Sequence, residues 1–162
     1  MLTELMAVGD IQEILTRNSV GRLACSQDDQ PYIVLMSYVY DGNHLYGFAT
    51  EGQKTRWMRS NPKVCFEVDE ISDRLQWASI VLKGHYRELI DSPQFAKDRI
   101  HAQKVLASRS LWWEPALSFR RLKTAGRFVT VLYTIEIYSM TGYRTVTKQA
   151  HKATSVSGNA AT

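Results

Sequence analysis

The sequence has few of the residues and motifs that mark secreted, membrane or metal-dependent proteins. Its 162 residues include 2 cysteines and 4 prolines, and no apolar run reaches the ~18 residues of a membrane-spanning helix. Cys25 and Cys65 are too few and too far apart for a disulfide framework or a CxxC centre. Both lie among apolar residues, which predicts free thiols that behave as small hydrophobic side chains of the core.

The N-terminal stretch also lacks the basic region and the compact apolar core of a signal peptide, so we expect a cytoplasmic protein. The length fits a single domain, which we place at residues 1–147. Residues 148–162 contain no core-forming pattern, and we predict that they form a disordered tail.

The familiar catalytic and metal-binding motifs are missing as well. The chain contains no G-x-S-x-G, no H-E-x-x-H and no G-x-G-x-x-G motif. The histidines are scattered without the spacing of metal ligands, so we predict no metal site; they are His44, His85, His101 and His151. No side chain stands out as a catalytic acid or base.

A modest positive charge is present. The formal net charge is +4 and the isoelectric point is about 9.1. Such an excess suits an anionic partner, but it is spread along the chain and does not separate a small anion from nucleic acid.

Short runs of β-branched and aromatic residues dominate the chain and predict about six strands. These strands are expected at residues 20–26, 32–40, 44–50, 63–69, 78–89 and 127–144. Most are joined by short turns, such as Asp41–Asn43, and are too close together for crossover helices, so the sheet is expected to be antiparallel. Helices are expected at residues 10–18, with Asp10 as N-cap, at 53–60 and at about 92–108. The predicted fold is mainly β (α+β), a six-stranded antiparallel barrel with peripheral helices.

The stretch "GFATEGQKT" (47–55) differs by one residue from the Walker A loop G-x-x-x-x-G-K-[ST]. The extra residue, Gln53, would rotate Lys54 by about 100° around a helix that begins at Gly52. The preceding strand is the second arm of a predicted hairpin, whereas a Walker loop follows a parallel strand. We therefore reject a nucleoside triphosphate loop.

The same stretch still offers the groups that bind a phosphate. Thr50 supplies a hydroxyl, the helix start supplies unpaired backbone N–H groups, and Lys54 lies in the first helical turn. In the alternative interpretation, Thr50 caps the helix, while Lys54, Arg56 and Arg59 form a solvated basic face. The sequence pattern alone leaves both interpretations open.

Three blocks of the chain resemble a known family: "GRLAC" (21–25), residues 31–70 from "PYIVLMSYVY" to "FEVDE", and "SIVLKGHYREL" (79–89). Their order resembles the FMN-binding split-barrel proteins related to pyridoxamine 5'-phosphate oxidase, in particular the small branch that includes nitroimidazole-resistance proteins. The resemblance implies a six-stranded split barrel that forms a homodimer and holds FMN at the subunit interface.

The resemblance also implies cofactor-binding positions. Thr50 and Lys54 match the groups around the FMN phosphate, the backbone of residues 35–38 follows the isoalloxazine edge, and Trp77 and Ser79 lie where the partner subunit approaches the flavin. Trp113, with Trp112 as its alternative, matches a residue that covers the ring. The full implied set is Leu35, Met36, Ser37, Tyr38, Thr50, Gln53, Lys54, Thr55, Trp77, Ser79 and Trp113.

Two departures from the family pattern bear on activity. The segment "SMTGYRTVTKQ" (139–149) lacks the arginine and histidine that pyridoxamine 5'-phosphate oxidases use for their substrate, which argues against that activity. Phe48 stands where nitroimidazole-resistance proteins usually have a histidine, which argues against a histidine-dependent reaction.

Our main hypothesis is an oxidoreductase that uses FMN for hydride or electron transfer to a small substrate, with NADH or NADPH as a candidate donor. The first alternative is a non-catalytic carrier of flavin or haem. The second, a nucleic-acid-binding β-barrel with stacking aromatics, ranks last because the aromatic residues lie mostly within alternating strands. For each tryptophan taken singly, an ordinary role in the core or at an interface remains the alternative.

Overall fold

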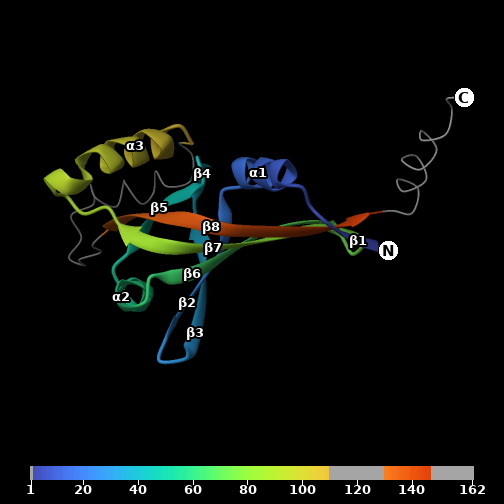
Figure 1. Cartoon of the computed structure of the whole chain (residues 1–162), viewed down its shortest axis with the longest axis horizontal. Helices are drawn as coiled ribbons and strands as arrows, with labels where there is room; N and C mark the ends of the chain where they lie inside the picture. The colour runs from blue at the N-terminus through green and yellow to red at the C-terminus, as the bar shows by residue number, and fades with distance from the viewer. Residues whose placement is uncertain (1, 110–129, 147–162) are drawn as a thin grey trace, which may run out of the picture.

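The computed structural model describes residues 2–109 and 130–146 of the chain (Figure 1). The helices are α1 (Val8–Arg17), α2 (Gln53–Ser60), the 3-10 turn η1 (Pro93–Phe95) and α3 (Ala96–Ala107). The strands are β1 (Leu2–Leu5), β2 (Val20–Gln27), β3 (Gln30–Ser37), β4 (Val39–Asp41), β5 (His44–Thr50), β6 (Lys63–Asp73), β7 (Gln76–Glu88) and β8 (Thr130–Val146). Trp112, Trp113 and the predicted tail at 148–162 lie outside the described residues.

The strands form one antiparallel sheet in the order β3-β2-β6-β7-β8-β5-β4, with β1 paired to β8. The two ends of this order, β3 and β4, are separated in the chain by Tyr38 alone. One continuous segment therefore connects both edges of the sheet, which is the arrangement of a split barrel. The mainly β prediction is confirmed: six strands are long, and the short strands β1 and β4 are added to them.

The helices cover the sheet from two sides. Figure 1 shows α1 and α3 on one side of the layer formed by β7 and β8, and α2 on the other side. The buried face of α1 consists of Ile11, Ile14 and Leu15, as the helical spacing predicts. None of the described helices is long and apolar enough to cross a membrane.

The core follows the alternation of the strands. In β6, Val64, Phe66 and Val68 are buried, while Cys65 and Glu67 face outward and are partly exposed. The alternation of apolar and polar residues in residues 63–69 predicts this pattern. Cys25 is buried as expected, but Cys65 lies on the outer side of β6 and is not a core residue, which corrects the prediction for that thiol. A second, smaller cluster beneath α3 contains Val39, Tyr46, Leu89, Ala102, Leu106 and Leu132.

Three further details of the sequence prediction are wrong. Asp10 is not an N-cap, because α1 begins at Val8 and the carboxylate of Asp10 pairs with Arg144 at 2.9 Å. The run 32–40 is not one strand, because fully buried Tyr38 interrupts it: its N–H donates to the Ser19 carbonyl at 2.9 Å and its hydroxyl to the Leu15 carbonyl at 3.0 Å. These bonds turn the chain from β3 into β4.

The third error concerns α3. The sequence spacing makes Phe95, Ile100, Val105 and Leu106 available for its inner face. Leu106 is buried as predicted and Phe95 and Val105 pack against the same cluster, but Ile100 is 67% exposed and Ala102 is buried instead. The helix starts at Ala96, after the 3-10 turn that Pro93 opens. Positions 100 and 102 are about 200° apart around a helix, so burial of Ala102 leaves Ile100 on the outer side.

The barrel closes where Gly47 of β5 meets the end of β3. A Cβ atom at position 47 would lie 2.5 Å from the Tyr133 hydroxyl and 2.9 Å from the Ser37 carbonyl. The Tyr133 hydroxyl donates to that carbonyl at 3.3 Å. Only glycine permits this approach, because any side chain would occupy the space of the hydrogen bond.

We therefore expect Gly47→Ala to destabilise the protein by about 1–3 kcal/mol through overpacking. Chemical denaturation with fluorescence detection measures this change. Gly9→Ala is the matched control, since a Cβ there meets nothing within 4 Å, and alanine is the better helix former. Equal stability of the two variants would contradict the close-approach account.

Candidate functional site

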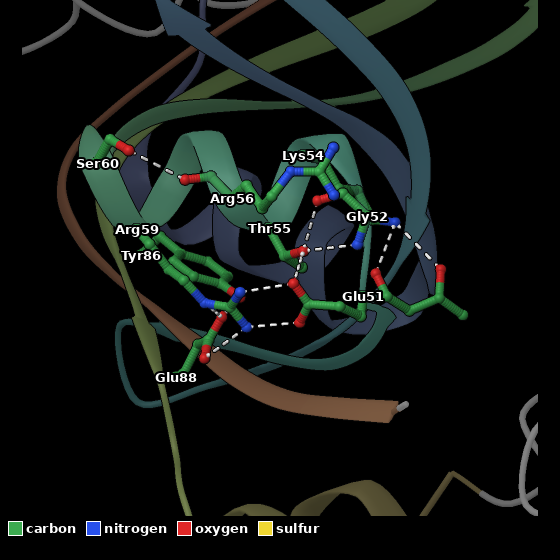
Figure 2. Close-up of polar contacts among 10 residues, drawn as sticks. Glu51, Gly52, Lys54, Thr55, Arg56, Arg59, Ser60, Tyr86 and Glu88 are labelled. Atoms are coloured by element: carbon green, nitrogen blue, oxygen red, sulfur yellow. Dashed lines mark hydrogen bonds and ion pairs between the residues drawn. The ribbon is translucent and has the colours of Figure 1, made fainter. Parts of the chain in front are cut away.

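The candidate phosphate site lies at the start of α2, directly after β5 (Figure 2). Helix α2 begins at Gln53, as the sequence predicts, and its N-cap is Gly52. The Thr55 hydroxyl, which is fully buried, accepts a hydrogen bond from the Gly52 N–H at 2.9 Å and lies 2.9 Å from the Gly52 carbonyl. Thr50 is therefore not the helix cap, and its hydroxyl is left for other contacts.

The first turn of α2 presents backbone donors. The Arg56 N–H makes the first bond of the helical ladder, to the Gly52 carbonyl at 3.1 Å. The N–H groups of Gln53, Lys54 and Thr55 therefore have no acceptor within the helix. Together with the positive end of the helix dipole, these groups favour an anion at this position.

Lys54 lies beside these donors. Its Nζ atom is 3.4 Å from both the carbonyl and the hydroxyl oxygen of Thr50. Burial lowers the pKa of Lys54 below its usual value, while Cys25 and Glu51 oppose this shift. Among the described residues, no carboxylate forms an ion pair with this ammonium. A partly desolvated cation without an anionic partner is a favourable site for a phosphate.

The alternative interpretation, a solvated basic face on α2, holds for exposed Arg56 but not for Arg59, which is paired with two acids. Arg59 forms two hydrogen bonds of 2.6 Å with Glu51 and pairs with Glu88 of β7 at 2.8 Å. The hydrogen bonds from Arg59 lower the pKa of Glu51. Sequence analysis missed this network, because it joins three separate segments and follows no helical spacing.

Strand β3 supplies the second part of the site. Leu35 is 70% exposed on the outer face of the sheet, whereas Met36 and Tyr38 are buried. Since β3 is an edge strand of the sheet order, alternate backbone groups along residues 35–37 point away from β2. The contact between Ser37 and Gly47 lies three residues before Thr50, about 10 Å along β5, so β3 and the start of α2 are close together.

Trp77 and Ser79 lie elsewhere. Both are on the outer face of β7 and line a shallow pocket of ≈ 370 Å³ together with Arg22, Glu67 and Asp69. Ser79 donates a hydrogen bond to Glu67 at 3.0 Å, and Arg22 pairs with Glu67 at 2.8 Å.

The residues at the start of α2 and the pair Trp77 and Ser79 lie toward opposite ends of strand β7. Nine residues of β7 separate Ser79 from Glu88, which contacts α2 through Arg59, and this is a distance of about 30 Å along a strand. Figure 1 shows α2 at one end of the long strands and the β6–β7 turn at the other. One chain therefore brings Thr50, Gln53, Lys54 and Thr55 together, but does not bring Trp77 or Ser79 to them.

The outer face of the sheet carries exposed apolar side chains. They are Val20 (45% exposed), Ile33 (62%), Leu35 (70%), Val81 (38%) and Tyr143 (52%). Strand register places all of them on one face, in the rows Val20–Ser37, Ala24–Ile33, Arg22–Leu35, Glu67–Val81 and Ser79–Tyr143. We call these five residues the outer apolar face. An exposed set of this kind is typical of an interaction surface.

Comparison with known proteins shows the family. The family model described as pyridoxamine 5'-phosphate oxidase matches residues 8–144. The chain belongs to this family. An uncharacterized protein of Rhizobium meliloti is 38% identical over 143 residues, which are 88% of this chain and 95% of that protein.

Solved structures agree with the membership. A FAD-binding protein of Mesorhizobium loti is 39% identical to this chain and has a TM-score of 0.71. The match covers 90% of this chain and 100% of the Mesorhizobium loti chain. A Bacteroides thetaiotaomicron protein provisionally named a 5-nitroimidazole antibiotic resistance protein has a TM-score of 0.63 at 16% identity, covering 88% and 87% of the two chains. The likeness to the second shows the shared fold. The resemblance read from the sequence is thereby confirmed.

The geometry at the start of α2 predicts how the binding of inorganic phosphate depends on pH, and this can be tested without a flavin. Because burial lowers the pKa of Lys54, the affinity for inorganic phosphate should fall as the pH rises from 8 through that lowered pKa. The Lys54→Arg variant should keep its affinity over this range, since arginine stays protonated. Lys54→Met should bind about tenfold more weakly at pH 8.

Isothermal titration with phosphate between pH 8 and 10.5 measures these affinities. The same decline in all three proteins would show that Lys54 does not contact the anion.

Proposed function

We propose that this protein is a homodimeric FMN-binding flavoprotein and an oxidoreductase acting on a small substrate. The observation that carries the proposal is the donor set at the start of α2, where free backbone N–H groups, the Thr50 hydroxyl and Lys54 converge. This set suits a phosphate dianion, and flavin mononucleotide carries one at the end of its ribityl chain.

Strand β3 fits the other part of the cofactor, the flavin ring. The flavin ring is flat and needs apolar walls with a few backbone donors and acceptors at its edge. The backbone of residues 35–37 provides such an edge close to Gly47 and therefore close to the phosphate site, whereas the Ser37 carbonyl and the Tyr38 N–H are engaged with Tyr133 and Ser19. Bound flavin would supply hydride or electron transfer, and the chain would supply binding and orientation.

The described side chains around α2 do not supply an evident acid or base. Glu51 and Glu88 are both engaged by Arg59. Burial raises the pKa of Tyr38, Tyr86 and Tyr133, so these hydroxyls stay protonated at neutral pH. We infer that the reaction depends on the position of the substrate against the flavin.

The separation of the α2 residues from Trp77 and Ser79 supports the proposed dimer. Trp77 and Ser79 are about 30 Å along β7 from the α2 end, and this separation supports a site that a second copy completes. The outer apolar face lies between the two groups and would be covered in such a dimer. Each flavin would then bind its phosphate end to one chain and contact Trp77 of the other.

FAD is a second candidate, because the 39% identical relative from Mesorhizobium loti is named a FAD-binding protein. Thr50 and Gln53 at the phosphate site are exposed, so a second phosphate would have room to extend into solvent. A flavin carrier without catalysis is the further alternative.

Titration of the purified protein with riboflavin, FMN and FAD distinguishes these candidates through quenching of flavin fluorescence. We expect FMN to bind at one molecule per chain and riboflavin about 10- to 100-fold more weakly, since riboflavin lacks the charged phosphate. Tighter binding of FAD than of FMN would favour the second candidate. A protein that responds to none of them would contradict a flavin function.

The reduction of bound flavin separates enzyme from carrier. We expect NADH or NADPH to bleach the flavin absorbance near 450 nm under anaerobic conditions. Retained flavin that neither donor reduces, or a Soret band on addition of haem in place of a flavin response, would favour a carrier.

A further inference from the structure

Glu51 creates an electrostatic conflict at the proposed phosphate site. Its position between Thr50 and Gly52 puts a carboxylate next to the groups that would hold a dianion. The pKa of Glu51 is lowered by the hydrogen bonds from Arg59, so Glu51 is charged at neutral pH. An unpaired carboxylate there would repel the phosphate.

The chain resolves this conflict through Arg59. Its guanidinium holds both Glu51 oxygens at 2.6 Å, and this bidentate geometry fixes the direction of the carboxylate. Figure 2 shows Glu51 pointing beneath α2 toward Arg59, while Lys54 lies on another side of the helix start.

Arg59 is itself held in place from β7. Glu88 accepts from Arg59 at 2.8 Å and 3.1 Å, and the Tyr86 hydroxyl donates to Glu88 at 3.1 Å. Both Glu88 and Tyr86 lie on a long strand of the sheet, so the guanidinium is anchored to the rigid part of the molecule.

We propose that Arg59 is a positioning residue for the cofactor phosphate: it holds the Glu51 carboxylate in a bidentate pair and turns it away from the phosphate, without touching the phosphate itself. This role rests on the proposed flavin function and adds a residue to it. The carboxylate of Glu51 is near enough to act on the charge of Lys54. Without Arg59, Glu51 would repel the dianion and compete with it for Lys54.

The test compares the dissociation constants of FMN and riboflavin for four proteins: wild type, Arg59→Gln, Arg59→Gln/Glu51→Gln and Arg56→Gln. Arg59→Gln should raise the FMN constant about tenfold and leave the riboflavin constant within about twofold, since riboflavin has no phosphate. Removing the carboxylate as well, in the double variant, should restore FMN binding to within about threefold of wild type.

Arg56→Gln is the matched control. It removes the same charge from the exposed surface of the same helix, where the Arg56 side chain forms no hydrogen bond or ion pair with the other described residues. Its effect on FMN should stay below about threefold at 0.15 M salt, because exposed charges are screened.

Three results would overturn the proposal. An Arg59→Gln protein with unchanged FMN affinity would show that Glu51 does not reach the phosphate. Equal losses for FMN and riboflavin would indicate a purely structural role. A loss that Glu51→Gln fails to restore would indicate that Arg59 binds the phosphate directly.

Should Arg59→Gln fail to fold, Glu51→Gln alone decides the matter. FMN affinity that is about two- to threefold tighter supports the positioning role, because the single variant removes the remaining repulsion between the carboxylate and the phosphate. Unchanged affinity would show that Glu51 does not act on the phosphate. A tenfold loss would contradict the positioning role. A wild-type protein that bound neither flavin would overturn the flavin site itself, a result distinct from a loss confined to the variants.

Discussion

The close approach of β3 to β5 at Gly47 is the constraint on which the rest of the structure depends. Because position 47 has no side chain, the Tyr133 hydroxyl reaches the Ser37 carbonyl at 3.3 Å and the two edges of the sheet meet. The same contact sets the backbone of residues 35–38 beside the end of β5, from which α2 begins. Barrel closure and the shape of the candidate site thus have one origin.

At the start of α2, Lys54 is the partly buried cation, and it has no ion pair with another described residue. Lys54 contacts only neutral oxygens of Thr50, while the neighbouring acid Glu51 is paired with Arg59. Because Glu51 is paired with Arg59, it does not form an ion pair with Lys54. Such an ion pair would cancel the attraction of Lys54 for an anion. The Glu51 carboxylate can therefore lie beside the proposed phosphate site without removing the attraction of Lys54 for an anion.

The sequence predicted the local elements better than their connections. The alternation in β6, the bounds of α2 and the hairpin at Asp41–Asn43 follow from side-chain period and turn residues, and the structure confirms them. The break at Tyr38 was missed, since it depends on carbonyls of Leu15 and Ser19 that are distant in sequence. The network of Arg59 was missed for the same reason.

The central claim is that each flavin site uses α2 of one chain and β7 of another, and mixed dimers test it most directly. Lys54→Met and Trp77→Ala should each weaken FMN binding in their own homodimers. A refolded mixture should regain wild-type affinity at one site per mixed dimer, because one of its two sites then contains both native residues. If the mixture binds no more tightly than the two separate variants, the shared site is contradicted.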